Sequence, residues 1–141
     1  MTTEEVKEYL SSYRNCLIEI RRLQQEQEEI RSIATSCGGA VGGGGNEVSD
    51  KVGKLAGRLA DLDSIIVAEM DKAITRRGEV KNTISQIEDE LLRLILEYKY
   101  INGMSLGLIS TKINYSYKQT KRLHKKALEK IKMSLNVPIE V

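Results

Sequence analysis

Residues 105–131 of the chain read SLGLISTKINYSYKQTKRLHKKALEKI. Ser105 is suited to cap a short helix over residues 106–113, because a serine hydroxyl accepts a hydrogen bond from the first helical turn. Ser116 is suited in the same way to cap a longer helix over residues 117–133. The turn between them is Asn114 and Tyr115, and the core residues expected in the short helix are Leu106, Ile109 and Ile113. This arrangement predicts a helix-turn-helix.

The longer helix separates its residue types by face, since successive side chains are about 100° apart around a helix. The expected inward residues are Thr120, Leu123, Ala127, Leu128 and Ile131, and the opposite side carries Lys118, Lys121, Arg122 and Lys125. A cationic face on a packed helix favours DNA binding. Two alternatives are a solvated lysine-rich helix that serves solubility and a free-standing ligand of membranes or calmodulin-like proteins.

A further helix is expected over residues 90–101, before this motif. Its predicted inward residues are Leu91, Leu94, Ile95 and Tyr98. The pair Asn102 and Gly103 should end it, because both residues tolerate the left-handed conformation of a helix C-cap.

Two long amphipathic helices are expected in the N-terminal half, over residues 3–35 and 47–78. The first stripe is Val6, Leu10, Tyr13, Leu17, Ile20, Gln24, Gln27, Ile30 and Ile33 or Ala34, and the second is Val48, Val52, Leu55, Leu59, Leu62, Ile66, Met70 and Ala73 or Ile74. Equal lengths and a glycine-rich connector at residues 37–46 favour an antiparallel hairpin within one chain. A coiled coil between two chains is the alternative.

Three glycines interrupt the second helix. Gly53 and Gly57 are read as tolerated surface positions, with close helix approach as the alternative. At Gly78 the regular spacing of the apolar residues shifts, and it then continues through Val80, Ile84 and Ile87. A kink or hinge is therefore expected at Gly78.

The composition supports an all-α fold. The 141 residues include no Phe, no Trp, six Tyr and one Pro, at position 138, which effectively excludes an all-β fold. Residues 1–98 hold 13 Lys and Arg against 18 Asp and Glu, a net charge of −5, whereas residues 99–141 hold 9 against 2, a net charge of +7. We therefore expect a helical hairpin over residues 1–78 and a basic helix-turn-helix domain over residues 79–141.

Other function classes find little support in the sequence. The glycine run at residues 38–45 lacks the Lys and Ser or Thr that a phosphate-binding loop needs, and His124 is the only histidine. We predict no enzyme activity, catalytic residue, metal site or cofactor. Cys16 and Cys37 are expected to be reduced thiols of a cytosolic protein, and no segment is apolar enough to be a signal peptide or a membrane span.

Residues 104–131 resemble region 4 of bacterial sigma factors, and residues 94–103 are similar to the first part of that region. The whole chain resembles the small sigma-region-4-like regulators of phages and prophages in Gram-positive bacteria, a group that includes RinA-type and ArpU-type late transcription activators. Gly107 and Leu108 stand where acidic residues are frequent in the family, which weakens any inference of contact with RNA polymerase.

The resemblance implies which residues contact DNA. Tyr117, Lys118, Lys121 and Arg122 would reach base edges in the major groove, Lys125 and Lys126 would lie along the phosphates, and Ser105 and Ser116 could donate to backbone phosphates. Arg122 is the best candidate for bidentate contact with guanine. The expected protein is a bacterial cytoplasmic, nucleoid-associated transcription regulator that binds double-stranded DNA.

Three points of this interpretation stay open. RNA polymerase is a possible partner, and the hairpin could also mediate a homodimer. A DNA-packaging subunit similar to small terminases is an alternative function, since such subunits also join a helix-turn-helix to helical segments. A structural or adaptor coiled-coil protein is the other alternative.

Overall fold

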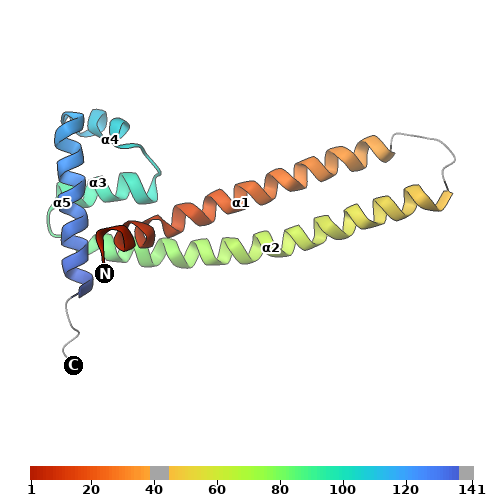
Figure 1. Cartoon of the computed structure of the whole chain (residues 1–141), viewed down its shortest axis with the longest axis horizontal. Helices are drawn as coiled ribbons and strands as arrows, with labels where there is room; N and C mark the ends of the chain where they lie inside the picture. The colour runs from red at the N-terminus through yellow and green to blue at the C-terminus, as the bar shows by residue number, and fades with distance from the viewer. Residues whose placement is uncertain (39–44, 137–141) are drawn as a thin grey trace, which may run out of the picture. The chain divides into compact units, whose positions relative to one another are not determined.

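The described part of the protein is entirely helical. The computed structural model describes residues 1–38 and 45–136, without the side chains of residues 37, 38, 45–49 and 136. Its helices, which can be followed in Figure 1, are α1 (Thr3–Gly38), α2 (Gly45–Ser85), α3 (Glu90–Leu96), the π-helix η1 (Glu97–Ile101), α4 (Leu106–Ile113) and α5 (Tyr117–Asn136). The predicted all-α class is confirmed. The centre of the predicted glycine-rich connector, residues 39–44, lies outside the described residues.

The chain divides into two compact units. The first unit contains Met1–Asn15 and Ala73–Val141, and the second contains Cys16–Lys72. Helices α1 and α2 each contribute residues to both units. Each unit has its own buried side chains, so each is described separately.

The second unit is held by contacts between α1 and α2. Its buried residues are Cys16, Ile20, Leu23, Gln27, Ile30, Leu62 and Ile66. Gln27 donates from Nε2 to Oδ1 of Asp63 at 2.6 Å, and Arg58 pairs with Glu26 at 3.0 Å. Cys16 is a free thiol.

The predicted stripe of α1 is wrong at one position of this unit. Gln24 is exposed, and the neighbouring Leu23 is buried in its place. Burial of a leucine side chain contributes roughly 1.5–3 kcal/mol, whereas burial of an unpaired amide is costly, so the helix turns Leu23 inward. Gln27, which the stripe places inward correctly, has its amide paired with Asp63.

A single apolar cluster fills the first unit. It consists of Val6 and Leu10 from α1, Val80 and Ile84 from α2, Ile87, then Leu92, Leu96, Tyr100 and Ile101 from α3 and η1, and Ala127, Leu128 and Ile131 from α5. Helix α2 runs without interruption through Gly78 to Ser85, because Val80 and Ile84 continue its buried side. A Cβ atom at Gly53 or Gly57 would meet no other atom within 4 Å, which agrees with the prediction that both are tolerated surface positions. A Cβ atom at Gly78 would also meet nothing within 4 Å.

The inward face predicted for residues 90–101 is displaced. Leu94, expected inside, is 36% exposed, and the buried residues are Leu92, Ile95, Leu96, Tyr100 and Ile101. Residues 92, 95 and 96 follow α-helical spacing, which would next bring Lys99 inward. The N–H of Asn102 instead bonds to the carbonyl of Glu97 at 3.0 Å, and this wider π turn brings Tyr100 to the core in place of Lys99.

Gly103 should resist substitution more strongly than Gly107. Gly103 has φ +72°, a backbone conformation that strains any other residue, and a Cβ atom there would also displace the guanidinium group of Arg14. We expect Gly103→Ala to destabilise the protein by about 1–3 kcal/mol. Gly107 lies in α4, where a Cβ atom would meet only the Ser105 hydroxyl, at an ordinary contact distance of 4.0 Å, so Gly107→Ala should stabilise by about 0.4–1 kcal/mol. Urea unfolding followed by circular dichroism measures both, and equal effects would contradict this prediction.

Candidate nucleic-acid interface

The connection between α4 and α5 has a defined backbone conformation. The Ser105 hydroxyl caps α4 by accepting from the Leu108 N–H at 3.2 Å. At the other end of α4, Asn114 adopts the left-handed conformation with φ 60°, and its N–H bonds to the carbonyl of Ser110. The Tyr115 N–H also bonds to the Ser110 carbonyl, at 3.1 Å. These bonds fix the direction in which the chain enters α5.

Ser116 and Gln119 form a reciprocal cap at the start of α5. The Ser116 hydroxyl accepts from the Gln119 N–H at 3.1 Å, and the Gln119 side-chain oxygen accepts from the Ser116 N–H at 3.2 Å. This arrangement is a capping box, for which Ser-x-x-Gln is the sequence signature. The sequence analysis names Ser116 alone as the cap, although the signature at residues 116–119 also identifies Gln119.

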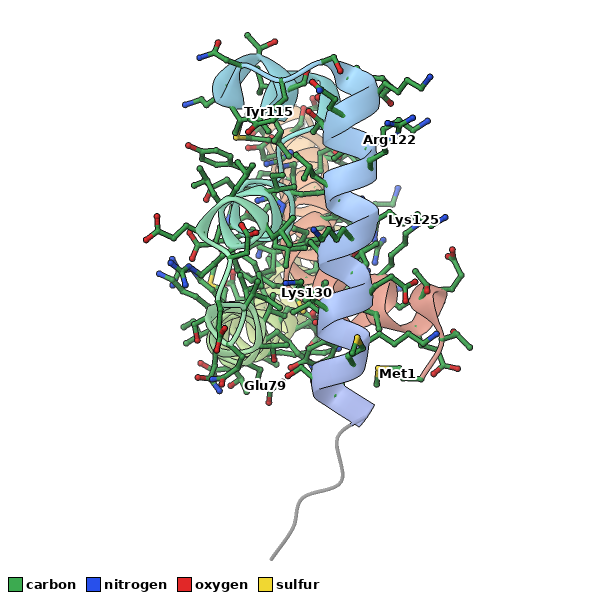
Figure 2. All side chains as sticks on the ribbon, turned by 90° about the vertical axis from the view of Figure 1, so that its left-hand side faces the viewer. Met1, Glu79, Tyr115, Arg122, Lys125 and Lys130 are labelled. Carbon is green, nitrogen blue, oxygen red and sulfur yellow. The ribbon has the colours of Figure 1, made fainter. Side chains whose placement is uncertain are left out.

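Helix α5 has a buried side and a cationic side. Its buried residues are Thr120, His124, Ala127, Leu128 and Ile131. The exposed cations include Lys118, Lys121, Arg122, Lys125 and Lys126. Figure 2 shows Arg122 and Lys125 projecting from the same side of α5. At 100° per residue, Lys130 lies about 40° around the helix from Lys126 but about 180° from Lys121, so it is on the opposite side of α5 from Lys121.

The structure brings six of the eight predicted DNA-contacting residues onto the exposed surface of one helix. These are Tyr117, Lys118, Lys121, Arg122, Lys125 and Lys126 of α5. Ser116 immediately precedes them, whereas Ser105 lies at the start of α4 and caps that helix. Both serine hydroxyls have hydrogen-bond partners within the protein, and their contact with phosphate stays a prediction.

Tyr117 and Lys121 form a pair one turn apart at the start of the cationic side. The Lys121 ammonium lies 5.5 Å from the centre of the Tyr117 ring, and Tyr117 remains 53% exposed. Cation–π attraction at an exposed site contributes about 0.5–1 kcal/mol, enough to favour one orientation of the ring. The pair therefore presents an aromatic face beside a positive charge.

Behind the cationic side, α5 is joined to η1 by a buried polar pair. The Tyr100 hydroxyl and Nε2 of His124 are 2.8 Å apart, and their rings are stacked with centroids 5.7 Å apart. Burial, followed by the charges of Lys99 and Lys7, lowers the pKa of His124 from 6.5 to about 4. Burial and the charge of Glu4 raise the pKa of Tyr100 to about 12. At neutral pH both side chains are therefore uncharged.

The inward position of His124 was missed because four charged residues, Lys121, Arg122, Lys125 and Lys126, lie within three positions of it in the sequence. Its spacing could have revealed it, since residues 120, 124 and 128 are separated by four and share one face of a helix. Thr120 and Leu128, the outer members of that series, are both buried. His124 continues the same buried row, and its polar atom is satisfied by Tyr100.

Acid should weaken folding through His124. Its folded pKa of about 4 lies below the 6.5 of an unfolded histidine, so the unfolded chain binds more protons between these values. This contribution to stability is present above pH 6.5 and is lost as the pH falls toward 4. We expect the stability difference between wild type and His124→Gln to shrink over that interval in urea unfolding. A difference that stays constant with pH would contradict this prediction.

Two features that the described residues lack bear on other classes of site. No group of three His, Cys, Asp or Glu side chains within residues 1–36 and 50–135 is placed to hold a metal ion. No helix in the described ranges is long and apolar enough to cross a membrane. Comparisons with protein-family models, curated proteins and solved structures found no match to this chain.

Proposed function

We propose that the protein is a sequence-specific DNA-binding transcription regulator in which α4 and α5 form a helix-turn-helix. One observation carries this proposal: α5 is buried on one side and presents five cations, Lys118, Lys121, Arg122, Lys125 and Lys126, on the rest of its surface. A helix of this kind fits the major groove of DNA, with its N-terminal residues at base edges. The capped connection before Tyr117 supports this docking by fixing the start of α5.

The long helices are proposed to form an antiparallel hairpin. The contacts of Glu26 with Arg58 and of Gln27 with Asp63 support it, because residues on either side of the connector are paired within one chain. A hairpin of this kind would supply a surface for a second copy or for RNA polymerase. The resemblance of residues 104–131 to sigma region 4 supports a place among phage or prophage transcription regulators.

A salt series tests the proposal. We expect wild-type protein to bind a mixed-sequence duplex with an affinity that falls steeply as salt increases, since phosphate contacts release counterions. Lys125→Ala should weaken binding to every duplex and reduce the slope of log affinity against log salt by about 0.9. Absence of salt-dependent binding by wild type would instead favour an adaptor protein. Binding by a ring of many subunits, measured as solution mass, would favour a DNA-packaging subunit.

A further inference from the structure

Two lysines outside α5 lie close to its buried histidine. Lys99 belongs to η1, and its ammonium is 5.8 Å from the centre of the Tyr100 ring. Tyr100 in turn contacts His124 at 2.8 Å. Lys7 belongs to α1, and its positive charge, like that of Lys99, reaches His124 strongly enough to lower the pKa of the imidazole. Both lysines are thus close to His124 in the middle of α5. Around that helix, Lys121 lies about 60° and Lys125 about 100° from His124.

The start of α1 is packed against the C-terminal half of α5. The Thr3 hydroxyl donates to Oε1 of Glu129 at 3.3 Å. Val6 and Leu10 belong to the same apolar cluster as Leu128 and Ile131. Figure 2 shows Met1 next to this half of α5. Lys7 follows Val6 directly, so its position beside α5 is set by buried neighbours rather than by a mobile chain end.

The charges of these lysines are available to a ligand. The Lys99 ammonium forms no ion pair with a carboxylate in the part of the chain that the structure describes. Lys7 pairs with Glu4 at 3.6 Å, and the two side chains are 44% and 81% exposed. An exposed pair of this kind contributes only about 0–1 kcal/mol, because water screens both charges. A phosphate group can therefore replace the Glu4 carboxylate.

We propose that Lys7 of α1 and Lys99 of η1 contact phosphates of the DNA strand that flanks α5, on the side of Lys121. This inference rests on the proposed function. When α5 lies in the major groove, the two phosphate backbones run along its flanks, and contacts to them position a protein without specifying sequence. Of the five cations of α5, Lys121 is nearest to His124 around the helix, at about 60°. Lys7 and Lys99, from neighbouring elements, are two cations outside α5 whose charges act on that histidine. The DNA-contacting surface thus includes the first turns of the chain.

Neutralising each lysine in the full-length protein tests the inference. Lys7→Gln and Lys99→Gln should each lower the affinity for a mixed-sequence duplex about fivefold near physiological salt and reduce the salt slope by about 0.9. Lys130→Gln is the matched control, because it removes the same charge from α5 away from this flank. Lys7→Arg and Lys99→Arg keep the charge and should bind nearly as wild type does.

The Glu4–Lys7 pair allows a second test that depends on a gain of affinity. Glu4→Gln should tighten DNA binding and steepen its salt dependence, because Lys7 is then free to contact phosphate. The same substitution should have a much smaller effect in a Lys7→Gln background. A merely structural role of Lys7 would not produce this coupling, and a variant that binds more tightly cannot be misfolded.

The outcomes separate this inference from the proposed function. If wild type binds DNA and the two glutamine variants match it in affinity and salt slope, Lys7 and Lys99 do not contact phosphate, and the proposed function stands. An equal effect of Glu4→Gln in both backgrounds would likewise overturn the role of Lys7. Failure of wild type to bind any duplex would overturn the proposed function itself.

Discussion

Replacing Arg122 by alanine is expected to abolish most of the sequence preference of DNA binding. Arg122 is exposed on the cationic side of α5, one turn and a residue beyond Tyr117, where a groove-docked helix approaches base edges. A bidentate contact of an arginine with guanine contributes about 1–3 kcal/mol of discrimination. Affinity for a duplex selected from a random-sequence pool should therefore fall roughly 5-fold to 150-fold.

Competition titrations with selected and scrambled duplexes measure this loss. Binding of Arg122→Ala to the scrambled duplex should fall only as far as the loss of one charge predicts. Lys130→Ala is the control, since it removes a cation from α5 outside the group around Arg122 and should leave the preference intact. Equal losses on both duplexes would show that Arg122 contacts phosphate and does not read bases.

The second large effect is expected in the core, where Leu96→Ala should destabilise folding by about 2–5 kcal/mol. Leu96 is fully buried at the end of α3, within the cluster that also includes Leu128 and Ile131 of α5. Removing its side chain leaves a cavity between α3 and the cationic helix. DNA binding should weaken when the temperature or urea concentration unfolds the variant.

Leu94→Ala provides the matched comparison. Leu94 lies two residues away in the same helix but is 36% exposed, so its truncation should change the free energy of unfolding by less than about 1 kcal/mol. Urea unfolding of the two variants distinguishes them. A larger loss at Leu94 than at Leu96 would contradict the described face of α3 and support the inward face that includes Leu94.

Local signals in the sequence predict several elements well. The helix over residues 106–113 has the bounds predicted for it, because Ser105 supplies the cap and Asn114 adopts the left-handed conformation that ends α4. Ser116 supplies the cap of α5 in the same way, so the predicted start of that helix at Tyr117 is also found. The basic side of α5 also follows from helical spacing alone. Each of these features depends on residues close together in the chain.

Features that depend on distant contacts could not be predicted in this way. Because η1 is a π turn, Tyr100 is buried in the core where regular α-helical spacing would place Lys99. The packing of Tyr100 against α5 explains this turn, and local sequence does not reveal that contact. Leu23 is buried instead of Gln24, because packing between α1 and α2 favours the apolar side chain. The burial of His124 requires Tyr100, which is 24 residues away in the chain.

Methylation interference on a selected duplex tests most directly whether α5 reads the major groove. Methylation of guanine N7 blocks that groove, so a guanine contacted by Arg122 should prevent binding of wild-type protein when it is methylated. The same methylation should have little further effect on Arg122→Ala. We expect at least one guanine whose methylation blocks the wild-type protein but has little further effect on Arg122→Ala. Wild-type binding that is unaffected by methylation at every guanine of the selected site would contradict it.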